Sequence, residues 1–394
     1  MNSGSPAPAS SELFEYHAPT PIWAGLGSRQ HVAAAASALG LSRVLLVASR
    51  RVLESSSGGE VVERLGNRRV ATYDGLGGEP DVADARRLAN YAKTVHADGV
   101  LVVGSGATLG LAKCAVVDLA SDGSLEDFQW SFDPASSMPQ GPPLPSSLLP
   151  IIALPTTAGS GSEVNGFGSV RHSDRGHKVA VRGAGLAPRV AILDGELTTS
   201  ASPRLTAGTG LNALSHCVES LYSKQAQPFS DGLALEAARR MAWSLPRCVR
   251  DGSDLEARQE QLVASAMSSM AFANAMLGVH AALCHALAIA TDVVYGDAQS
   301  VIFGRALAFR SEVIEPATAQ ICEVMGLGGP GSPHERLAEW ADNLGGPTRL
   351  RDIGVDRTQL ASLASVAFND RCVAADPRPV RDQGDLLDIL EQAW

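Results

Sequence analysis

The sequence predicts an α/β domain with a parallel, Rossmann-like sheet over residues 1–200 and an all-helical domain over residues 201–394. Three observations support this division. The length of 394 residues exceeds what one hydrophobic core usually holds. Short apolar runs alternate with helix-like stretches in the first half of the chain. After Pro203 the strand-like runs largely disappear, and long stretches rich in alanine and leucine follow.

Four short apolar runs predict the sheet. Each has the length of a strand and lacks alternation, which is typical of a strand buried on both faces of a sheet. Helix-like stretches at 31–39, 82–96 and 109–119 separate them, so we expect a mostly parallel sheet. A segment rich in proline and serine, 132–150, is predicted to be a surface loop. The four runs are 43–48, 99–103, 151–154 and 190–193.

The second half of the chain predicts packed helices. Its apolar stretches follow one another with almost no strand-like run between them. We place the domain boundary near residue 200 and find no internal repeat. The main helical stretches are 205–223, 230–242, 255–277, 281–290 and 298–309.

Composition and charge exclude several classes of function. The net charge of −10 argues against a nucleic-acid partner or an anionic membrane. No segment approaches the apolar run that a membrane span requires, and residues 1–11 lack the basic and apolar regions of a secretory signal. We therefore expect a cytoplasmic protein whose scattered cysteines are reduced core thiols. They are Cys114, Cys217, Cys248, Cys284, Cys322 and Cys372.

Loops rich in glycine and hydroxyl side chains lie beside the predicted strands. Glycine lets the backbone approach a phosphate, and a helix that starts after such a loop offers unpaired N–H groups. One loop alone could be a tight turn without a ligand. Three loops around one parallel sheet favour a nucleotide lying across the carboxyl ends of the strands. The candidate residues are Gly25 and Gly27, then Gly104, Ser105, Gly106, Ala107 and Thr108, then Thr156, Thr157 and Ser162.

Asn212 and His216 lie four residues apart in a predicted helix, so both side chains project from one face. An aspartate in place of Asn212 would make this pair half of a divalent-metal site, but an amide is a much poorer ligand. His280 and His285 lie in another predicted helix. Each histidine could be an ordinary core or surface residue. Together with His216, they could also line one polar pocket.

The blocks 155–163, with the sequence PTTAGSGSE, and 104–107, with the sequence GSGA, carry a family resemblance. The first is close to the signature of the iron-containing alcohol dehydrogenase superfamily, which shares its fold with dehydroquinate synthase. The second resembles the phosphate loop of that superfamily. Within it the chain is most similar to the maleylacetate reductases, as at Gly110, where metal-dependent members carry an aspartate. Further matches are 190–194, 376–380 and 390–394.

The resemblance also implies where a metal would be bound. Metal-dependent members hold iron or zinc with one aspartate and three histidines, and these positions match Asn212, His216, Ala281 and Tyr295. Because only His216 keeps a ligand, we expect no bound metal. Maleylacetate reductases also carry asparagine at the first position but usually keep histidine at the others. The pocket of this chain therefore departs from theirs, which puts maleylacetate as the substrate in doubt.

These features predict a metal-independent, NAD(P)H-dependent reductase that transfers hydride to a conjugated or carbonyl-bearing small molecule. A proton donor must then stabilise the developing negative charge. The position of Ser49, before two arginines, often carries an acid in NAD-selective relatives, so we expect tolerance of NADP as well as NAD. The resemblance implies a homodimer. The alternative is a non-redox enzyme, such as a cyclase or isomerase, or a binding protein. The candidate donors are His280, His285 and Tyr295, with His216 and Asn212 as orienting groups.

Overall fold

The structure is a computed structural model that describes residues 14–121, 124–130, 141–172 and 177–394. The expectation for residues 1–11 lies outside these ranges, and so does the first part of the loop predicted at 132–150. Residues 141–150 lie within them and form neither helix nor strand.

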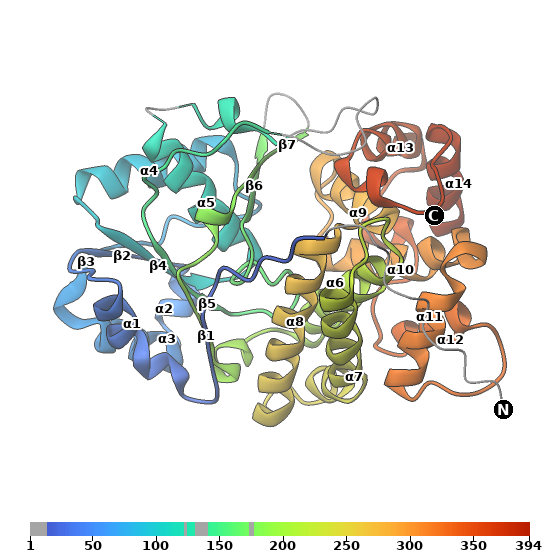
Figure 1. Cartoon of the computed structure of the whole chain (residues 1–394), viewed down its shortest axis with the longest axis horizontal. Helices are drawn as coiled ribbons and strands as arrows, with labels where there is room; N and C mark the ends of the chain where they lie inside the picture. Colours follow the sequence, from blue (N-terminus) through green and yellow to red (C-terminus); the bar gives the residue numbers. More distant parts are fainter. Residues whose placement is uncertain (1–13, 122–123, 131–140, 173–176) are drawn as a thin grey trace.

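A parallel sheet of six strands forms the centre of the first half of the molecule (Figure 1). Its order is β1-β8-β5-β4-β2-β3, and every neighbouring pair is parallel. The chain places β3 on one side of β2 and then β4 on the other, so the strand order reverses between β2 and β4. Ligands of open α/β sheets bind at the carboxyl ends of the strands beside such a reversal. The strands are β1 (Ile22–Ala24), β2 (Val44–Ala48), β3 (Arg69–Tyr73), β4 (Gly99–Gly104), β5 (Ile151–Pro155) and β8 (Val190–Leu193).

Helices cover both faces of this sheet. Val32 and Val61 of α1 and α3 pack on one face, whereas Leu88 and Leu109 of α4 and α5 pack on the other. All five residues of β2 are buried as a result, which explains why its sequence does not alternate. The helices of this half are α1 (Val32–Ala38), α2 (Arg50–Leu53), α3 (Ser56–Leu65), α4 (Val82–Thr94) and α5 (Gly106–Ala120).

An antiparallel hairpin, β6 (Phe167–His172) and β7 (His177–Arg182), stands apart from the main sheet. Val170 and Val179 pack into the same core as α5, and the hairpin lies between the main sheet and the helical half (Figure 1). The sequence analysis did not predict this hairpin, nor β1 and β3. These strands mix polar with apolar residues or span only three residues, so their sequences carry little of the apolar signal of a central strand.

The described chain after Pro203 contains helices and no strand, which confirms the predicted fold class. The first helix begins where Ser202 accepts a hydrogen bond from the backbone N–H of Leu205 at 3.2 Å, with Pro203 in the first turn. The helices are α6 (Pro203–Tyr222), α7 (Pro228–Arg250), α8 (Leu255–Ala275), α9 (Val279–Ala290), α10 (Tyr295–Phe309), α11 (Ser311–Met325), α12 (Pro333–Asp342), α13 (Leu360–Phe368) and α14 (Gln383–Ala393).

Two further expectations concern membrane spans and cysteines. No single one of them is both long and apolar enough to cross a membrane; α8 and α9 reach that length and composition only as a pair, bent by 104° at their junction. All six cysteines are free thiols in buried positions, as expected.

Candidate functional site

A cavity of about 820 Å³ lies between the carboxyl edge of the sheet and the helical half. The loops after β4 and β5 line one end of it, and α6, the start of α10 and Arg371 and Cys372 line the other. Ligand sites of enzymes are usually concave spaces of this size that join two parts of a molecule.

The sheet end offers backbone donors without a capping side chain. Ser105 is the N-cap residue of α5, but its hydroxyl makes no capping hydrogen bond to the helix. The first N–H groups of α5 are therefore available to an anion, which the helix dipole also favours. Gly106 faces the next loop so closely that a Cβ built on it would lie 2.2 Å from the Ser160 hydroxyl oxygen. Only glycine leaves this cradle open.

The candidate nucleotide-binding residues divide into two groups. Ser105, Gly106, Ala107, Thr157 and Ser162 line the cavity. The others lie at the same edge of the sheet without lining it, and several make structural hydrogen bonds. Ser49 caps α2, the N–H of Gly27 donates to Asp194 at 3.2 Å, and the N–H of Thr156 donates to the carbonyl of Gly104. The residues outside the lining are Gly25, Gly27, Ser49, Gly104, Thr108 and Thr156.

Lys113 supports the loop after β5, a role that the sequence analysis missed. This fully buried residue of α5 donates from Nζ to the backbone carbonyls of Ser162 at 2.6 Å and Asn165 at 2.7 Å. A third donation reaches the carbonyl of Phe167 at 2.9 Å. Burial lowers the pKa of Lys113 to about 7, although the Glu163 carboxylate acts in the opposite direction. The signal available in the sequence was a lysine with apolar residues on both sides, at 111–112 and 114–117.

Asn212 and His216 of α6 are both buried and both line the helical end of the cavity. Burial lowers the pKa of His216 to about 3, with smaller contributions from the charges of His280 and His285. The His216 ring lies 4.4 Å from the Phe272 ring, between centroids, and its Nδ1 has no hydrogen-bond partner in the part of the chain that the structure describes. A neutral imidazole and an amide therefore form this wall.

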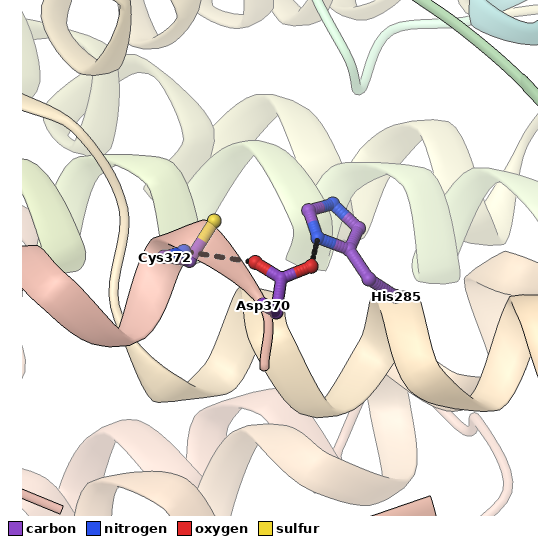
Figure 2. A group of neighbouring side chains, drawn as sticks. All are labelled: His285, Asp370 and Cys372. Atoms are coloured by element: carbon purple, nitrogen blue, oxygen red, sulfur yellow. Dashed lines mark hydrogen bonds and ion pairs between the residues drawn. The ribbon is translucent and has the colours of Figure 1, made fainter. Parts of the chain in front are cut away.

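His285 of α9 lines the same cavity and is held by Asp370. Its Nδ1 lies 2.9 Å from Asp370 Oδ2, and the other carboxylate oxygen accepts the backbone N–H of Cys372 at 2.8 Å (Figure 2). Burial acts to raise the pKa of Asp370, but the His285 and Arg371 charges outweigh it and hold that pKa below its ordinary value. An ionised carboxylate only accepts hydrogen bonds, so His285 Nδ1 carries the donated proton.

Tyr295 lies beside this pair at the start of α10. Its ring stacks on the His285 ring, with centroids 6.2 Å apart and planes at 13°. Burial raises the pKa of Tyr295 well above its ordinary value, so the phenol stays neutral. The structure thus brings His216, His285, Tyr295 and Asn212 together at one end of the cavity.

His280 does not join them. It is buried in α9 outside the cavity lining, with its ring edge-on to Phe303 and its Nε2 3.5 Å from the Gln299 carbonyl. Burial lowers the pKa of His280 to about 3. The expectation that three histidines share one pocket therefore holds for His216 and His285 only.

Buried acids hold the start of α9, and the sequence analysis did not identify them. Glu219 Oε1 accepts the backbone N–H groups of Gly278 at 3.0 Å and His280 at 3.1 Å. Asp376 Oδ2 accepts the N–H of Val279 at 3.0 Å and pairs with Arg310 Nε at 2.6 Å. These acids act as remote caps and fix the position of α9, and with it the position of His285.

The residues at the family's metal positions do not fit a divalent ion. Ala281 offers no donor atom, Asn212 offers only an amide, and Tyr295 is a neutral phenol. Too few ligands of the required kind remain. One helical turn after Ala281, potential ligand atoms of His285, Asp370 and Cys372 lie within 4.8 Å of one another. In that group, the His285 nitrogen that faces Asp370 is already engaged in the hydrogen bond of Figure 2.

Comparison with known proteins identifies the family. The model for the iron-containing alcohol dehydrogenase matches residues 19–195, and the model for the C-terminal part of the Fe-containing alcohol dehydrogenase family matches residues 206–394. The chain is 31% identical over 304 residues to the probable alcohol dehydrogenase EutG of Escherichia coli (strain K12), covering 76% of this chain and 74% of that protein. It is 28% identical over 364 residues to 4-hydroxybutyrate dehydrogenase of Cupriavidus necator, with coverages of 90% and 93%.

Solved structures agree with this result. Sulfoacetaldehyde reductase from Bifidobacterium kashiwanohense, in complex with NAD+, superposes with a TM-score of 0.86 at 25% identity, covering 97% of this chain and 99% of that one. Maleylacetate reductase from Rhizobium sp. strain MTP-10005 superposes with a TM-score of 0.79 at 26% identity, with coverages of 97% and 98%. The resemblance noted from the sequence motifs is thereby confirmed. This chain belongs to the iron-containing alcohol dehydrogenase family.

Proposed function

We propose that this protein is an NAD(H)-dependent oxidoreductase that exchanges hydride with a small carbonyl compound or alcohol, and that His285 exchanges the proton. In this proposal no metal ion acts at the family's four positions. One observation carries it: a single cavity joins the uncapped start of α5 to the His285–Asp370 pair. A phosphate-binding cradle and a positioned proton donor are the two parts that such a reaction needs.

The cofactor assignment is supported by the sheet end of the cavity. Ser105, Gly106 and Thr157 line it, and the Gly106 backbone leaves space that any side chain would fill. These residues would hold the pyrophosphate, while the bound nicotinamide would supply or accept the hydride. The NAD+ complex of the similar sulfoacetaldehyde reductase supports the same assignment.

The proton assignment follows from the Asp370 contact. Because Asp370 accepts a hydrogen bond from Nδ1–H, Nε2 is the nitrogen of His285 left for the substrate oxygen. In reduction, hydride goes from the nicotinamide to the carbonyl carbon and the Nε2 proton of the imidazolium goes to the oxygen; in alcohol oxidation the neutral Nε2 takes that proton back. The side chains of His285 and Asp370 are 16% and 10% exposed, and this burial holds the imidazole in one orientation. Tyr295 stacks on that ring and keeps its own proton, so it can donate a hydrogen bond to the same oxygen.

Use of NADP is also part of the proposal. Arg50 and Arg51 follow the carboxyl end of β2, where a nucleotide ribose lies in Rossmann-like sheets. Arg50 is exposed and pairs loosely with Asp74 at 3.4 Å, so its guanidinium can turn to a 2′-phosphate. Arg51 donates to the carbonyl of Ser200 and is less free to move.

A second candidate function is a non-redox enzyme or a binding protein on the same fold. Two observations favour it. Asn212 and Ala281 lack the metal-binding side chains of the family, and Ala107 stands where the family's phosphate loop usually has a serine. Nucleotide binding and turnover separate the two candidates. A reductase binds NADH or NADPH and oxidises the bound nucleotide when an aldehyde is added. A non-redox protein does not oxidise the nucleotide under the same conditions.

The test is a titration with NADH and NADPH followed by turnover of an aldehyde panel. Each assay is run on enzyme as purified, after treatment with a chelator, and after addition of Zn²⁺ or Fe²⁺. We expect turnover that the chelator does not reduce. A rate that falls with chelator and returns with added metal would contradict the metal-free assignment. Absence of nicotinamide binding would favour the second candidate.

A further inference from the structure

A positive charge without a direct ion pair among the described residues lies beside the His285–Asp370 pair. Arg371 lines the cavity and directly follows Asp370 in the chain, so the two Cα atoms are about 3.8 Å apart. The Arg371 guanidinium carbon lies 5.5 Å from the centre of the Trp130 ring. Arg371 is therefore close to the site of proton exchange and packs on an aromatic surface.

Arg182 approaches the same indole. Its guanidinium carbon lies 4.8 Å from the centre of the Trp130 ring and 4.8 Å from that of Phe167. Phe167 and Arg371 line the cavity, whereas Trp130 and Arg182 lie outside its lining and contact these two residues or each other. A donation from Arg182 Nη2 to the carbonyl of Ala273 at 3.3 Å fixes the position of this side chain.

Among the described residues, no carboxylate lies within ion-pair distance of Arg182 or Arg371. Asp370 acts on Arg371 through charge alone, and both of its oxygens are engaged by His285 and by a backbone N–H. Burial lowers the pKa of Arg182, and the charge of Arg371 lowers it further, because the two cations repel each other. An oxyanion bound in the cavity would relieve this repulsion and accept hydrogen bonds from the Arg371 guanidinium.

Two other cations near the cavity have carboxylate partners. Lys178, which also lines the cavity, pairs with Glu79 at 2.7 Å, and the fully buried Arg310 pairs with Asp376 at 2.6 Å. Partly buried charges are normally compensated in this way. A third cation, Arg171, lines the cavity without such a partner among the described residues, but its Nη2 donates to the carbonyl of Ala288 at 3.0 Å. Arg182 and Arg371 differ from all three because they share one aromatic ring, that of Trp130.

We propose that Arg371, with Arg182 adding its charge from across the Trp130 ring, forms a subsite for an oxyanion of the substrate, which is thus a carbonyl compound carrying a carboxylate or sulfonate group. The inference rests on the proposed function, since it places the carbonyl group at His285. The Phe167 ring lines the cavity, so it can pack against the part of the substrate between the carbonyl carbon and the anionic group.

The test compares substrates that differ in charge. NADH-dependent kcat/KM is measured for two anionic aldehydes, 4-oxobutanoate and sulfoacetaldehyde, and for the neutral aldehyde butanal. Butanal has the same number of carbon atoms as 4-oxobutanoate, so the two differ mainly in charge. We expect the better anion to exceed butanal by about 10-fold or more. Arg371→Gln should lower that ratio about 10- to 100-fold, the range for loss of a charge-assisted hydrogen bond. Arg371→Lys should restore part of it, because the charge remains but the planar fork does not.

A matched variant and a binding measurement complete the test. Arg357 packs over the Trp394 ring at 5.4 Å, far from the cavity, so Arg357→Gln should leave the ratio unchanged. Calorimetry of succinate binding to the NADH-saturated enzyme reports on the subsite without turnover. If no aldehyde reacts, the proposed function fails, while succinate binding that Arg371→Gln abolishes would still support the subsite. A ratio or a succinate affinity that Arg371→Gln leaves unchanged would overturn the inference.

Discussion

The two ends of the cavity are built from different kinds of interaction. At the sheet end, the uncapped start of α5 and the glycine at 106 present backbone groups. At the helical end, ionisable side chains such as His285 and Asp370 meet across 85 positions of sequence. The first end depends on the local path of the backbone, and the second depends on long-range contacts.

The sharpest test of this contrast is removal of the proposed proton donor. His285→Gln keeps a side chain of similar length but removes the imidazole that Asp370 positions. We expect kcat for aldehyde reduction to fall about 10²- to 10⁴-fold, the usual contribution of general acid catalysis. The affinity for NADH should change little, because the sheet end is untouched. Stopped-flow NADH oxidation and an NADH titration measure the two quantities separately.

His280→Gln is the discriminating comparison, since the sequence alone did not separate the two histidines. His280 lies outside the cavity lining, so its loss should affect kcat far less than the loss of His285. An equal or larger loss in His280→Gln would reverse the assignment.

Asp370→Asn should lower kcat less than His285→Gln does, because the imidazole remains but loses its orienting contact.

The sheet end was largely predictable from the sequence, for a physical reason. A strand followed by glycine and hydroxyl residues encodes its own turn, and the following helix starts within a few residues. The predicted loops after β4 and β5 accordingly line the cavity through Ser105, Gly106 and Thr157. Gly25 and Ser49 lie at the same edge but outside the lining. The sequence could not exclude them, because it does not show how far each loop extends toward the cavity.

The helical end was predictable only in part. Spacing placed Asn212 and His216 on one face of α6, and both line the cavity. No local pattern connects His285 with Asp370, or the start of α9 with Glu219 and Asp376. These contacts join segments 85, 61 and 97 positions apart, and only the packing of the helices brings them together. Helical periodicity predicts a face, but it does not predict which distant residue meets that face.

A smaller effect is expected from closing the cradle at the sheet end. In Gly106→Ala, the new methyl carbon would lie 2.2 Å from Ser160 Oγ and 2.8 Å from its Cβ, so the loop after β5 must shift. We expect the Kd for NADH to rise about 10-fold, equivalent to about 1.4 kcal/mol, with kcat reduced less. Fluorescence titration with NADH measures the change.

Two further variants decide whether the cause is this contact. Ser160→Gly in the Gly106→Ala background removes the obstructing side chain and should recover part of the affinity. Gly232→Ala is the matched control, because a Cβ at that position of α7 meets nothing within 4 Å. An unchanged Kd in Gly106→Ala would mean that the cradle does not hold the nucleotide.

The smallest expected effect concerns stability in acid, to which the helical end contributes through its buried histidines. Burial lowers the pKa of His280 to about 3, whereas an unfolded histidine titrates near 6.5. Between these values the unfolded chain binds a proton that the folded chain does not, so the free energy of unfolding falls as the pH falls below 6.5. The loss is at most about 1.4 kcal/mol per pH unit for one group.

His280→Gln should reduce this loss of unfolding free energy per pH unit by up to the same amount, measured by urea unfolding at several pH values between 7 and 5. His17→Gln, at a position exposed to water, should leave the slope unchanged. A wild-type slope that His280→Gln does not alter would mean that His280 is already accessible to protons in the folded state, and it would remove the distinction drawn here between His280 and His285.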